Sequence, residues 1–481
     1  MSFQHMALLL AACSASLFGI AACSSDSGSG SSGGTSSTIQ NVTDAELMPL
    51  LAAANAGTPA APASNTTAMI ELGRALFYDK ILSGNQDISC ATCHHSEAAG
   101  GDNLPLSFGT GAIGSNENRL PSSMDPDTVE DQMIPRNAPT IFNLGSPGVD
   151  VMFLDGRVRM NPDGTFLAPA PELSGIFPTR PDYTDVFDSA LAVQAMFPVT
   201  SREEMRGKLN ESELGNVTRD IDVWELLMAR LVGTNNGTVG GIAEYRAMFM
   251  AAYPNVTSYD DLNFAHAATA MAAFERHVYL SVNSPYDRYL AGDMNALTQQ
   301  EKNGAALFFG EAGCSSCHNG PHLSDFDFHN TAMPQLGPGK EDLNDEDDQG
   351  LFLRTLNAAD RYKFRTYPLR NVAETGPWGH DGAYTTLRGI VEHHLDPAQA
   401  ALNYDPTQLP EIFRPYYRDD AAKIQGRINR LDPDFAAPKN LSAQEVDALI
   451  AFLHALTDTE MLANLPNEAP DTVPSGLPVA D

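Results

Sequence analysis

Cysteine is scarce in this sequence, which has six in 481 residues. Two of them, Cys13 and Cys23, lie near the start of the chain. The other four form two Cys-x-x-Cys pairs, and a histidine follows each pair directly. No cysteine is left over for a disulfide in the mature part of the chain, which argues against a small disulfide-framed scaffold.

Basic residues are also few, because 29 lysines and arginines stand against 61 aspartates and glutamates, for a formal net charge of -32. This balance argues against a nucleic-acid partner, since proteins that bind nucleic acids neutralise phosphates with lysine and arginine. It predicts that a basic soluble protein would be steered towards this chain on encounter.

The apolar run at the N-terminus, Ala7 to Ala22, is too short to span a membrane. It ends in Ile-Ala-Ala before Cys23 and gives way to Ser, Gly and Thr, which predicts a lipoprotein-type signal peptide over 1–22 and a lipid on Cys23. Residues 1–6 lack the lysine or arginine usual in such signals. We expect a periplasmic protein that is tethered to the membrane through this lipid alone, with a Ser/Gly/Thr/Ala-rich linker over 23–66.

Each cysteine pair with its histidine has the spacing of a c-type haem attachment motif. The two thiols form thioethers to the haem edge, and the adjacent imidazole reaches the iron. The residues are Cys90, Cys93 and His94 in the first motif, and Cys314, Cys317 and His318 in the second. A structural zinc site is the alternative, but neither pair has a second thiol pair nearby. We therefore expect two covalently bound haem c groups.

No convincing run of alternating residues predicts strands, so we expect a mainly α fold of two c-type cytochrome-like haem domains with long loops. Apolar residues at helical spacing predict helices over 69–78, 260–279, 302–309 and 442–456. The first and third of these directly precede a haem motif, which implies two related units. The predicted boundaries give an N-terminal haem domain over 67–285, a C-terminal haem domain over 286–465 and a tail over 466–481.

Histidine is absent between His95 and His266, so the first haem has no nearby candidate for a second imidazole ligand. Several histidines follow the second motif. In residues 386–395 the apolar positions form one helical face that includes His394 and leaves His393 outside it. His394 is therefore a candidate ligand of the second haem, and a hydrogen-bonded core histidine is the alternative. An open iron favours chemistry on a small oxygen species, whereas a closed iron favours electron transfer.

Two segments are expected to be loops. Residues 160–184 are rich in Pro and Gly and predict a surface insertion. The acidic run 341–348 predicts a solvated loop. It does not fit a calcium loop, because Gln349 and Leu356 stand where that loop needs an Asp or Asn and a Glu.

Over roughly residues 69–456, the chain resembles the bacterial di-haem cytochrome c peroxidases and the related MauG-type oxidases. The resemblance rests on both haem motifs and on three further segments. These are Pro-Arg-Asn-Ala-Pro-Thr at 135–140, Phe-Leu-Asp-Gly-Arg at 153–157, and Pro-Leu-Arg-Asn-Val at 368–372 leading to His-Asp-Gly at 380–382. It implies that the first haem takes peroxide and that the second relays electrons to it from a small donor protein.

The family pattern at the peroxide site is met by Gln194, Pro198 and Glu204, the last followed by Met205. The resemblance implies that Glu204 is the acid–base group and that Gln194 orients the peroxide. Splitting the O–O bond requires a proton taken from one oxygen and given to the other, which a carboxylate beside the iron can do. Without the resemblance, Glu203 and Glu204 would be an ordinary pair at a helix start.

Two departures from the family concern the iron ligands. Thr110 stands where many family peroxidases carry a histidine that must leave before they work, so the first haem is expected to be open in the oxidised protein. His394 stands where the peroxidases usually have Met and the MauG-type enzymes have Tyr, and bis-histidine ligation gives a lower potential than a His/Met pair. Both departures favour reaction with peroxide from the diferric state.

Two further implications concern the region between the haems. Leu154 stands where family members often have a tryptophan, and Trp378 is a candidate substitute in the electron route. The resemblance also implies a calcium ion held by Asn137 and by the backbone carbonyls of Thr375 and Pro377.

Three functions compete on the sequence. The leading one is a cytochrome-c peroxidase that reduces hydrogen peroxide with electrons from a small cytochrome c or copper protein. The alternative is a MauG-like oxidase that uses peroxide to modify residues of a partner protein. A pure electron carrier would need both irons closed, for example by Met124 or Met133 at the first. By analogy with the family, a homodimer is possible.

Overall fold

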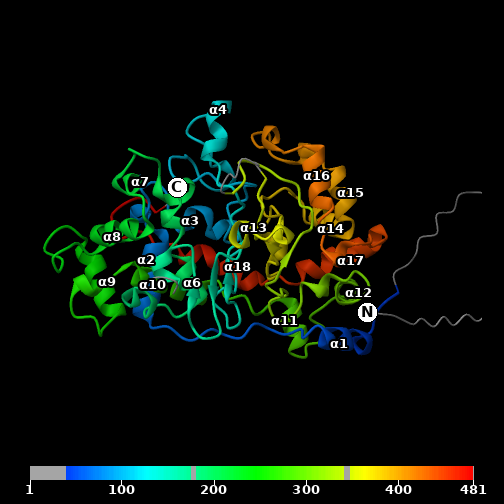
Figure 1. Cartoon of the computed structure of the whole chain (residues 1–481). Coiled ribbons are helices and arrows are strands. Elements are labelled where there is room, and N and C mark those ends of the chain that lie inside the picture. The colour runs from blue at the N-terminus through cyan, green and yellow to red at the C-terminus, as the bar shows by residue number, and fades with distance from the viewer. Residues whose placement is uncertain (1–39, 175–179, 341–346, 480–481) are drawn as a thin grey trace, which may run out of the picture. The chain divides into compact units, whose positions relative to one another are not determined.

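The computed structural model describes residues 40–174, 180–340 and 347–479, and they are mostly helical, as predicted (Figure 1). The predicted signal peptide and Cys23 lie outside the described residues. In the described part, no helix is both long and apolar enough to cross a membrane.

Short connections and loops join the helices. The α-helices are α1 Asp44–Ala53, α2 Thr67–Tyr78, α3 Cys90–Cys93, α4 Pro126–Val129, α5 Pro181–Thr184, α6 Ala190–Gln194, α7 Glu213–Asn216, α8 Asp220–Leu231, α9 Ala243–Ala252, α10 Phe264–Val278, α11 Pro285–Leu290, α12 Gln299–Phe309, α13 Phe352–Thr355, α14 Leu387–Leu395, α15 Pro397–Leu402, α16 Ala421–Ile428, α17 Ala443–His454 and α18 Thr459–Asn464. The strands are β1 Val151–Met152, β2 Val158–Met160 and β3 Phe166–Leu167 in one antiparallel sheet, and the antiparallel pair β4 Phe328–His329 and β5 Phe364–Arg365.

The four helices predicted from apolar spacing are present as α2, α10, α12 and α17. Each begins after a residue whose side chain accepts a hydrogen bond from the first turn. These capping residues are Thr66, Asn263, Thr298 and Ser442. The last two belong to complete capping boxes, in which Glu301 and Glu445 bond back to the cap.

The same helix crossing occurs twice in the chain. A Cβ added to Gly73 of α2 would lie 1.9 Å from the carbonyl oxygen of Ala270 in α10. A Cβ on Gly304 of α12 would lie 1.9 Å from the carbonyl oxygen of Ala448 in α17. Each glycine therefore lets two backbones approach closely, just before a haem motif. Figure 1 shows α2 beside α10, and α12 beside α17.

Two large clusters of buried apolar side chains make up most of the core. The first cluster draws on residues 72–279, and the second on residues 286–456. The ends of the described chain cross over: Leu47 and Leu51 of α1 belong to the second cluster, whereas Leu465 and Val473 belong to the first. The predicted linker 23–66 thus contains a packed helix, and part of the predicted tail 466–481 is packed as well.

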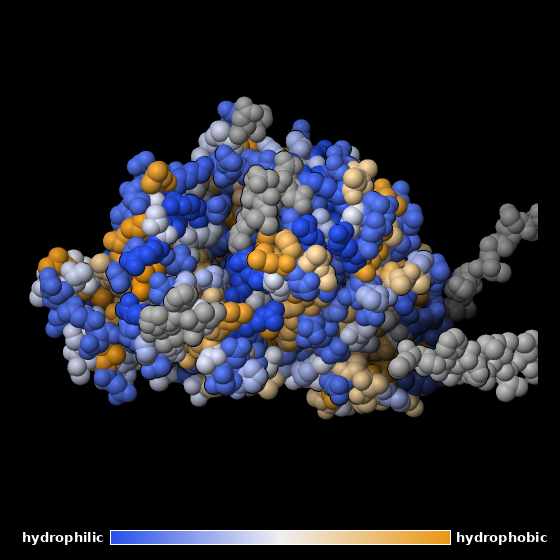
Figure 2. All heavy atoms as spheres, in the orientation of Figure 1, coloured by the Kyte–Doolittle hydropathy of each residue, from blue (hydrophilic) through white to orange (hydrophobic). Residues whose placement is uncertain are grey.

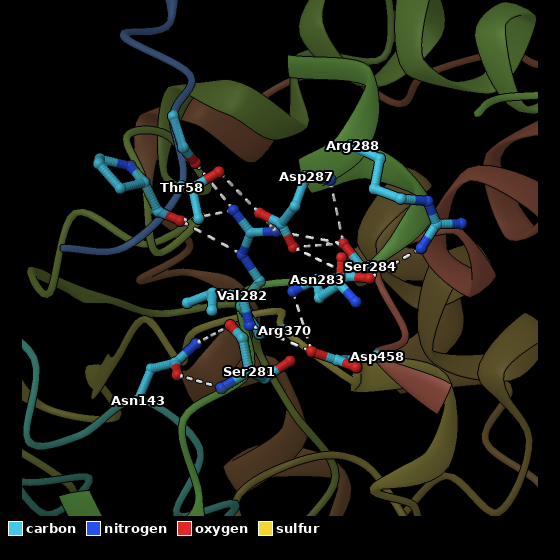
Figure 3. A network of polar contacts seen from close by, with 12 residues as sticks. Thr58, Asn143, Ser281, Val282, Asn283, Ser284, Asp287, Arg288, Arg370 and Asp458 are labelled. Carbon is cyan, nitrogen blue, oxygen red and sulfur yellow. Dashed lines mark hydrogen bonds and ion pairs between the residues drawn. The ribbon is translucent and has the colours of Figure 1, made fainter. Parts of the chain in front are cut away.

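A buried polar network surrounds the connection between α10 and α11 (Figure 3). The guanidinium of Arg370 is fully buried and donates to Asp287 Oδ1 at 2.7 Å and to the carbonyl of Gly57 at 2.8 Å. Asp458 Oδ2 accepts from the backbone N–H of Val282 and Asn283. These bonds tie the connection to segments from both ends of the described chain.

Two loop predictions need correction. The segment 160–184 includes the end of β2 and all of β3, and its Leu173 and Tyr183 are buried in the first cluster. The segment therefore packs partly on the core and is not wholly a surface insertion. In the acidic run, residues 341–346 lie outside the described part, but Asp347 and Asp348 are buried in ion pairs with Arg427 and Arg136. Figure 2 shows that hydrophilic side chains cover most of the visible face, with apolar side chains in small separate groups.

Candidate active site

Each cysteine motif faces its own cavity. The first cavity, of about 150 Å³, is lined by the Cys90-to-His94 motif and by side chains mainly from the first half of the chain. The second cavity, of about 420 Å³, is lined by the Cys314-to-His318 motif and by α14.

Both motifs are single helical turns, which set the two thiols on one side. α3 spans Cys90–Cys93, and a 3₁₀ turn spans Cys314–Ser316. Residues three apart in a helical turn are neighbours on its surface. All four thiols are free, and burial raises the pKa of Cys90 and of Cys314 to about 12. The thiols of Cys90 and Cys314 are therefore neutral, and they lie at the cavity walls, where they are available for covalent attachment.

Three histidines are oriented in the same way. The Nδ1–H of His94 donates to the carbonyl of Gly100 at 3.0 Å, and that of His318 donates to the carbonyl of Leu323 at 3.0 Å. His394 donates likewise to Ile390 at 2.9 Å. A carbonyl can only accept, so each imidazole carries its proton on Nδ1 and leaves Nε2 for another partner. Burial lowers the pKa of all three rings, which keeps them neutral.

His394 lies across the second cavity from the motif. Burial lowers the pKa of His318 to about 4, and the proximity of His394 lowers it in the same direction. Among the other histidines of this cavity, His329 has both ring nitrogens bonded to aspartates. The His380 ring stacks on Phe364 at 4.1 Å, and its Nδ1 is buried without a hydrogen-bond partner among the described residues.

The prediction that His393 faces away from the interior is wrong. Its ring is buried: Nε2–H donates to the carbonyl of Thr331 at 2.7 Å, and Nδ1 accepts from the hydroxyl of Tyr384 at 2.7 Å. The side of α14 that carries His393 is buried as well as the side that carries the apolar stripe, and the stripe identified only the second of these. Because both nitrogens of His393 are occupied, His394 is the one of the two that can ligate.

Side chains from a π-helical turn and from the end of α6 line the first cavity opposite the motif. The turn spans Arg202–Arg206 and carries Glu204, and Gln194 is the last residue of α6. Pro198 and Met205 line the same cavity. Neither the Gln194 amide nor the Glu204 carboxylate is hydrogen-bonded to another described residue, so both are available to a ligand. Glu203 is exposed and points elsewhere.

The loop around Thr110 turns away from the first cavity. The Thr110 hydroxyl donates to Asp87 at 2.7 Å, and its backbone N–H donates to the carbonyl of Glu204 at 2.8 Å. Buried Arg119 donates to the carbonyls of Phe108 and Gly109. Among the described residues that line this cavity, His94 is the only histidine.

The methionines considered as ligands of the first iron do not reach this cavity. Met133 packs in a separate apolar cluster, and Met124 is exposed. Three other methionines do line the cavity: Met152, Met205 and Met271.

The two cavities share a wall. The residues that line both are Asn137, Pro139, Leu154, Arg365 and Tyr367. Leu154 thus lies between the cavities, as the family resemblance implied for its position. Trp378 lines only the second cavity, whereas Tyr367 is the aromatic residue that lines both.

Several residues of the first cavity were missed by sequence reasoning. Lys340 reaches it from the second half of the chain, and burial with Arg157 lowers its pKa while Glu204 raises it. Glu275 of α10 is fully buried, which raises its pKa to about 8. Arg157 could have been noticed as part of the Phe-Leu-Asp-Gly-Arg segment; Lys340 and Glu275 carry no local signal.

The residues proposed for calcium all line the second cavity: Asn137, Thr375 and Pro377. The Asn137 amide nitrogen donates to the carbonyls of Leu104 and Pro105, which leaves its oxygen for another partner. In the described part, the one group of three His, Cys, Asp or Glu side chains close enough to share a metal is Cys317, Asp325 and His329. The first motif does not gather such a group, which argues against zinc there.

The donor sets fit a c-type haem in each cavity. Two free thiols lie on one helical turn, and a neutral imidazole beside them keeps Nε2 unused. With a haem present, His94 would hold the iron in the first cavity, and His318 and His394 are the residues that would hold the iron in the second.

Comparisons with known proteins agree with this geometry. A family model for di-haem cytochrome c peroxidase matches residues 67–295. The cytochrome-c peroxidase IdrP2 of Denitromonas iodatirespirans is 27% identical, over 83% of this chain and 84% of its own. The cytochrome c551 peroxidase of Pseudomonas aeruginosa is 27% identical, over 82% and 80%. The methylamine utilization protein MauG of Methylorubrum extorquens is also 27% identical, over 69% of each chain.

Two solved structures share the fold. A MauG-like protein associated with microbial copper homeostasis superposes with a TM-score of 0.56 and 26% identity, over 85% of this chain and 95% of its own. The diheme peroxidase BthA from Burkholderia thailandensis superposes with a TM-score of 0.51 and 20% identity, over 83% and 88%. The second likeness concerns the fold alone.

Proposed function

Because this chain belongs to the di-haem cytochrome c peroxidase family, whose relatives include MauG, we propose that it reduces hydrogen peroxide to water with electrons from a small periplasmic donor protein. The chain is an oxidoreductase of the class that acts on peroxide. In the proposed scheme the first haem takes peroxide, and the second haem relays electrons to it.

The observation that carries this proposal is the asymmetry of the two cavities. The first is lined by one histidine, His94, and by the carboxylate of Glu204 and the amide of Gln194. The second is lined by His318 and His394, two imidazoles that each leave Nε2 for another partner. One site is therefore suited to an exchangeable small ligand and the other to electron transfer alone.

The side chains of the first cavity transfer the protons that the reaction requires. Reduction of one peroxide to two waters consumes two electrons and two protons, and a bound haem supplies the electrons and the binding position. Glu204 takes the proton from one peroxide oxygen and gives it to the other. Gln194 donates its amide N–H to peroxide and orients it, since that amide has no competing partner among the described residues. The ammonium group of Lys340 lines the same cavity and places a positive charge near Glu204.

Electrons must cross the shared wall. We assign this step to Tyr367, because its aromatic side chain lines both cavities, whereas Trp378 lines only the second. A bis-imidazole second haem, with a low potential, passes electrons on readily but accepts them less easily from a donor. The net charge of -32 favours a basic donor, either a cytochrome c or a copper protein.

The test is steady-state peroxide turnover with a reduced small cytochrome as donor. Glu204→Gln should abolish turnover while both haems stay bound. Glu203→Gln is the matched control, because its exposed side chain lies next in the chain but outside the cavity. Full turnover in the Glu204→Gln variant would refute the acid–base role.

A MauG-like oxidase is the second candidate. His394 favours it, because the side chain opposite His318 is not the methionine usual in the peroxidases. In that case peroxide would modify residues of a partner protein. Turnover only when such a partner is present, and none with small donors, would favour this candidate.

Other features complete the proposal. We propose a periplasmic location, with a lipid on Cys23 as the membrane tether. A calcium ion at Asn137, Thr375 and Pro377 and a homodimer belong to the same proposal. Each follows from the sequence and the family resemblance.

A further inference from the structure

Arg365 of β5 is a buried cation in the wall between the two cavities. Its side chain is about 3% exposed and lines both. Nε donates to the carbonyl of Phe153 at 3.1 Å. Nη1 and Nη2 are buried, and neither atom has a hydrogen-bond partner within residues 40–174, 180–340 and 347–479. The guanidinium lies over the ring of Tyr367, 4.6 Å from its centroid, which fixes its position.

Arg365 has no carboxylate partner among the described residues. The other buried arginines have a carboxylate or several backbone carbonyls as partners, and Arg119 and Arg206 are of the second kind. Four buried arginines pair with aspartates: Arg136 with Asp155 and Asp348, Arg276 with Asp188, Arg370 with Asp287 and Arg427 with Asp347. Burial lowers the pKa of Arg365, and Tyr367 is the one side chain that acts against this effect. The hydroxyl of Tyr367 is neutral, because burial raises its own pKa.

An unbalanced buried cation is costly, since a low dielectric disfavours an isolated charge. The fold keeps this charge at a place that faces both cavities, although a neutral side chain could fill the same volume. The missing anion must then arrive from a cavity. A c-type haem carries two propionate carboxylates, so a haem in either cavity would supply anions of the kind that this cation lacks.

We propose that Arg365 is the shared counter-cation of the two haems, balanced by their carboxylates and raising the reduction potential of both irons. Arg365 is thus a positioning residue that acts through charge and takes no part in bond breaking. This inference rests on the proposed function, because it requires a haem in each cavity. The reduction potentials of the two haems would then depend on the same charged side chain, which lies outside both haem motifs.

The experiment is a spectroelectrochemical titration of the holoprotein, with the two haems followed separately. Arg365→Gln should lower both midpoint potentials, each by about a tenfold change in the ferric-to-ferrous ratio at fixed potential, ~59 mV for one electron. Arg365→Lys keeps the charge and should leave both potentials near those of the wild type. Arg219→Gln is the control, because this exposed arginine is screened by solvent.

The outcomes separate this inference from the function beneath it. Fewer than two haems per wild-type chain would refute the proposed function before Arg365 is considered. Two haems with unchanged potentials in Arg365→Gln, or a shift in only one of them, would overturn the shared role alone. If Arg365→Gln does not fold, the lysine variant decides, and a fall of both potentials in it would contradict a role based on charge.

Discussion

The hydroxyl of Thr110 donates a 2.7 Å hydrogen bond to Asp87, and the N–H of Gly111 donates to the same carboxylate at 2.6 Å. These two hydrogen bonds hold the loop beside the first cavity, with the side chain of Thr110 turned away from that cavity. Arg119 fixes the loop from the other side through two of its carbonyls. The loop is therefore bound on both sides in a position that leaves the cavity open.

The oxidised protein should react with peroxide without prior reduction. Thr110 offers no imidazole to the first iron, and the bonds to Asp87 and Arg119 oppose a rearrangement of the loop. Stopped-flow mixing of the ferric protein with peroxide should show an immediate spectral change. Protein that has first been incubated with the reduced donor should react at the same rate. A lag that disappears on pre-reduction would mean that the first iron is closed at rest, for instance by one of the cavity methionines.

His394 and its neighbour His393 should behave differently when replaced. The oxidised protein should give one high-spin and one low-spin bis-imidazole signal in electron paramagnetic resonance. His394→Ala should remove the low-spin signal, because Nε2 of this ring faces the second cavity. His393→Ala should keep that signal but lower stability by about 1–3 kcal/mol, since it leaves the Tyr384 hydroxyl and the Thr331 carbonyl unpaired. Loss of the low-spin signal in the His393 variant instead would exchange the two roles.

Tyr367 and Trp378 should differ in their effect on electron transfer between the haems. Tyr367→Leu removes the aromatic ring from the shared wall and should slow the transfer by about tenfold or more, whereas Trp378→Leu should leave it near the wild-type rate. Flash photolysis of the half-reduced protein measures this rate directly. Equal slowing in both variants would show that the route runs through the second cavity wall as well.

Gly304→Ala should destabilise the protein. Its new Cβ would meet the carbonyl oxygen of Ala448 at 1.9 Å, so α12 and α17 must separate, at a cost of about 1–3 kcal/mol or more. Gly426→Ala in α16 is the control, because its nearest neighbour would be 3.8 Å away and alanine favours a helix by about 1 kcal/mol. Urea unfolding of both holoproteins measures the two effects. Equal effects in the two variants would show that the crossing tolerates a side chain.

The acid side of the stability profile should depend on Asp155. Burial alone would raise its pKa, but the guanidinium groups of Arg136, Arg157 and Arg354 lower it below the usual 3.8. A lowered folded-state pKa stabilises the protein above the unfolded value, and this contribution is lost as the pH falls through the folded one. Asp155→Asn should therefore cost about 3 kcal/mol at pH 7, and the difference from the wild type should shrink below about pH 4.

Urea unfolding at a series of pH values tests this dependence. Asp182→Asn is the control, because its pair with Arg180 is exposed and such pairs contribute at most about 1 kcal/mol. A difference for Asp155→Asn that stays constant from pH 7 to pH 3 would mean that the carboxylate charge is not what stabilises this site.

Local patterns explain what the sequence could predict. The haem motifs and the helices before them are contiguous, so spacing alone located them, and capping residues marked the helix starts. His393 was misjudged because an apolar stripe identifies one buried face, whereas α14 is covered on both. Arg365, Tyr367 and Lys340 meet the cavities only through tertiary packing, and no local spacing marks them. The burial of Asp347 and Asp348 likewise depends on arginines that are distant in sequence.

The crossed ends of the chain determine the order in which it can fold. The backbone N–H of Val42 bonds to Asn303, 261 residues later, and α1 packs on the second cluster. Val473 completes the first cluster just over 400 residues after Leu72 begins it. Synthesis proceeds from the N-terminus, so neither cluster can be finished on a partly made chain. Each half of the chain therefore lacks part of the apolar cluster that it mainly builds, which makes the two halves unsuited to separate expression.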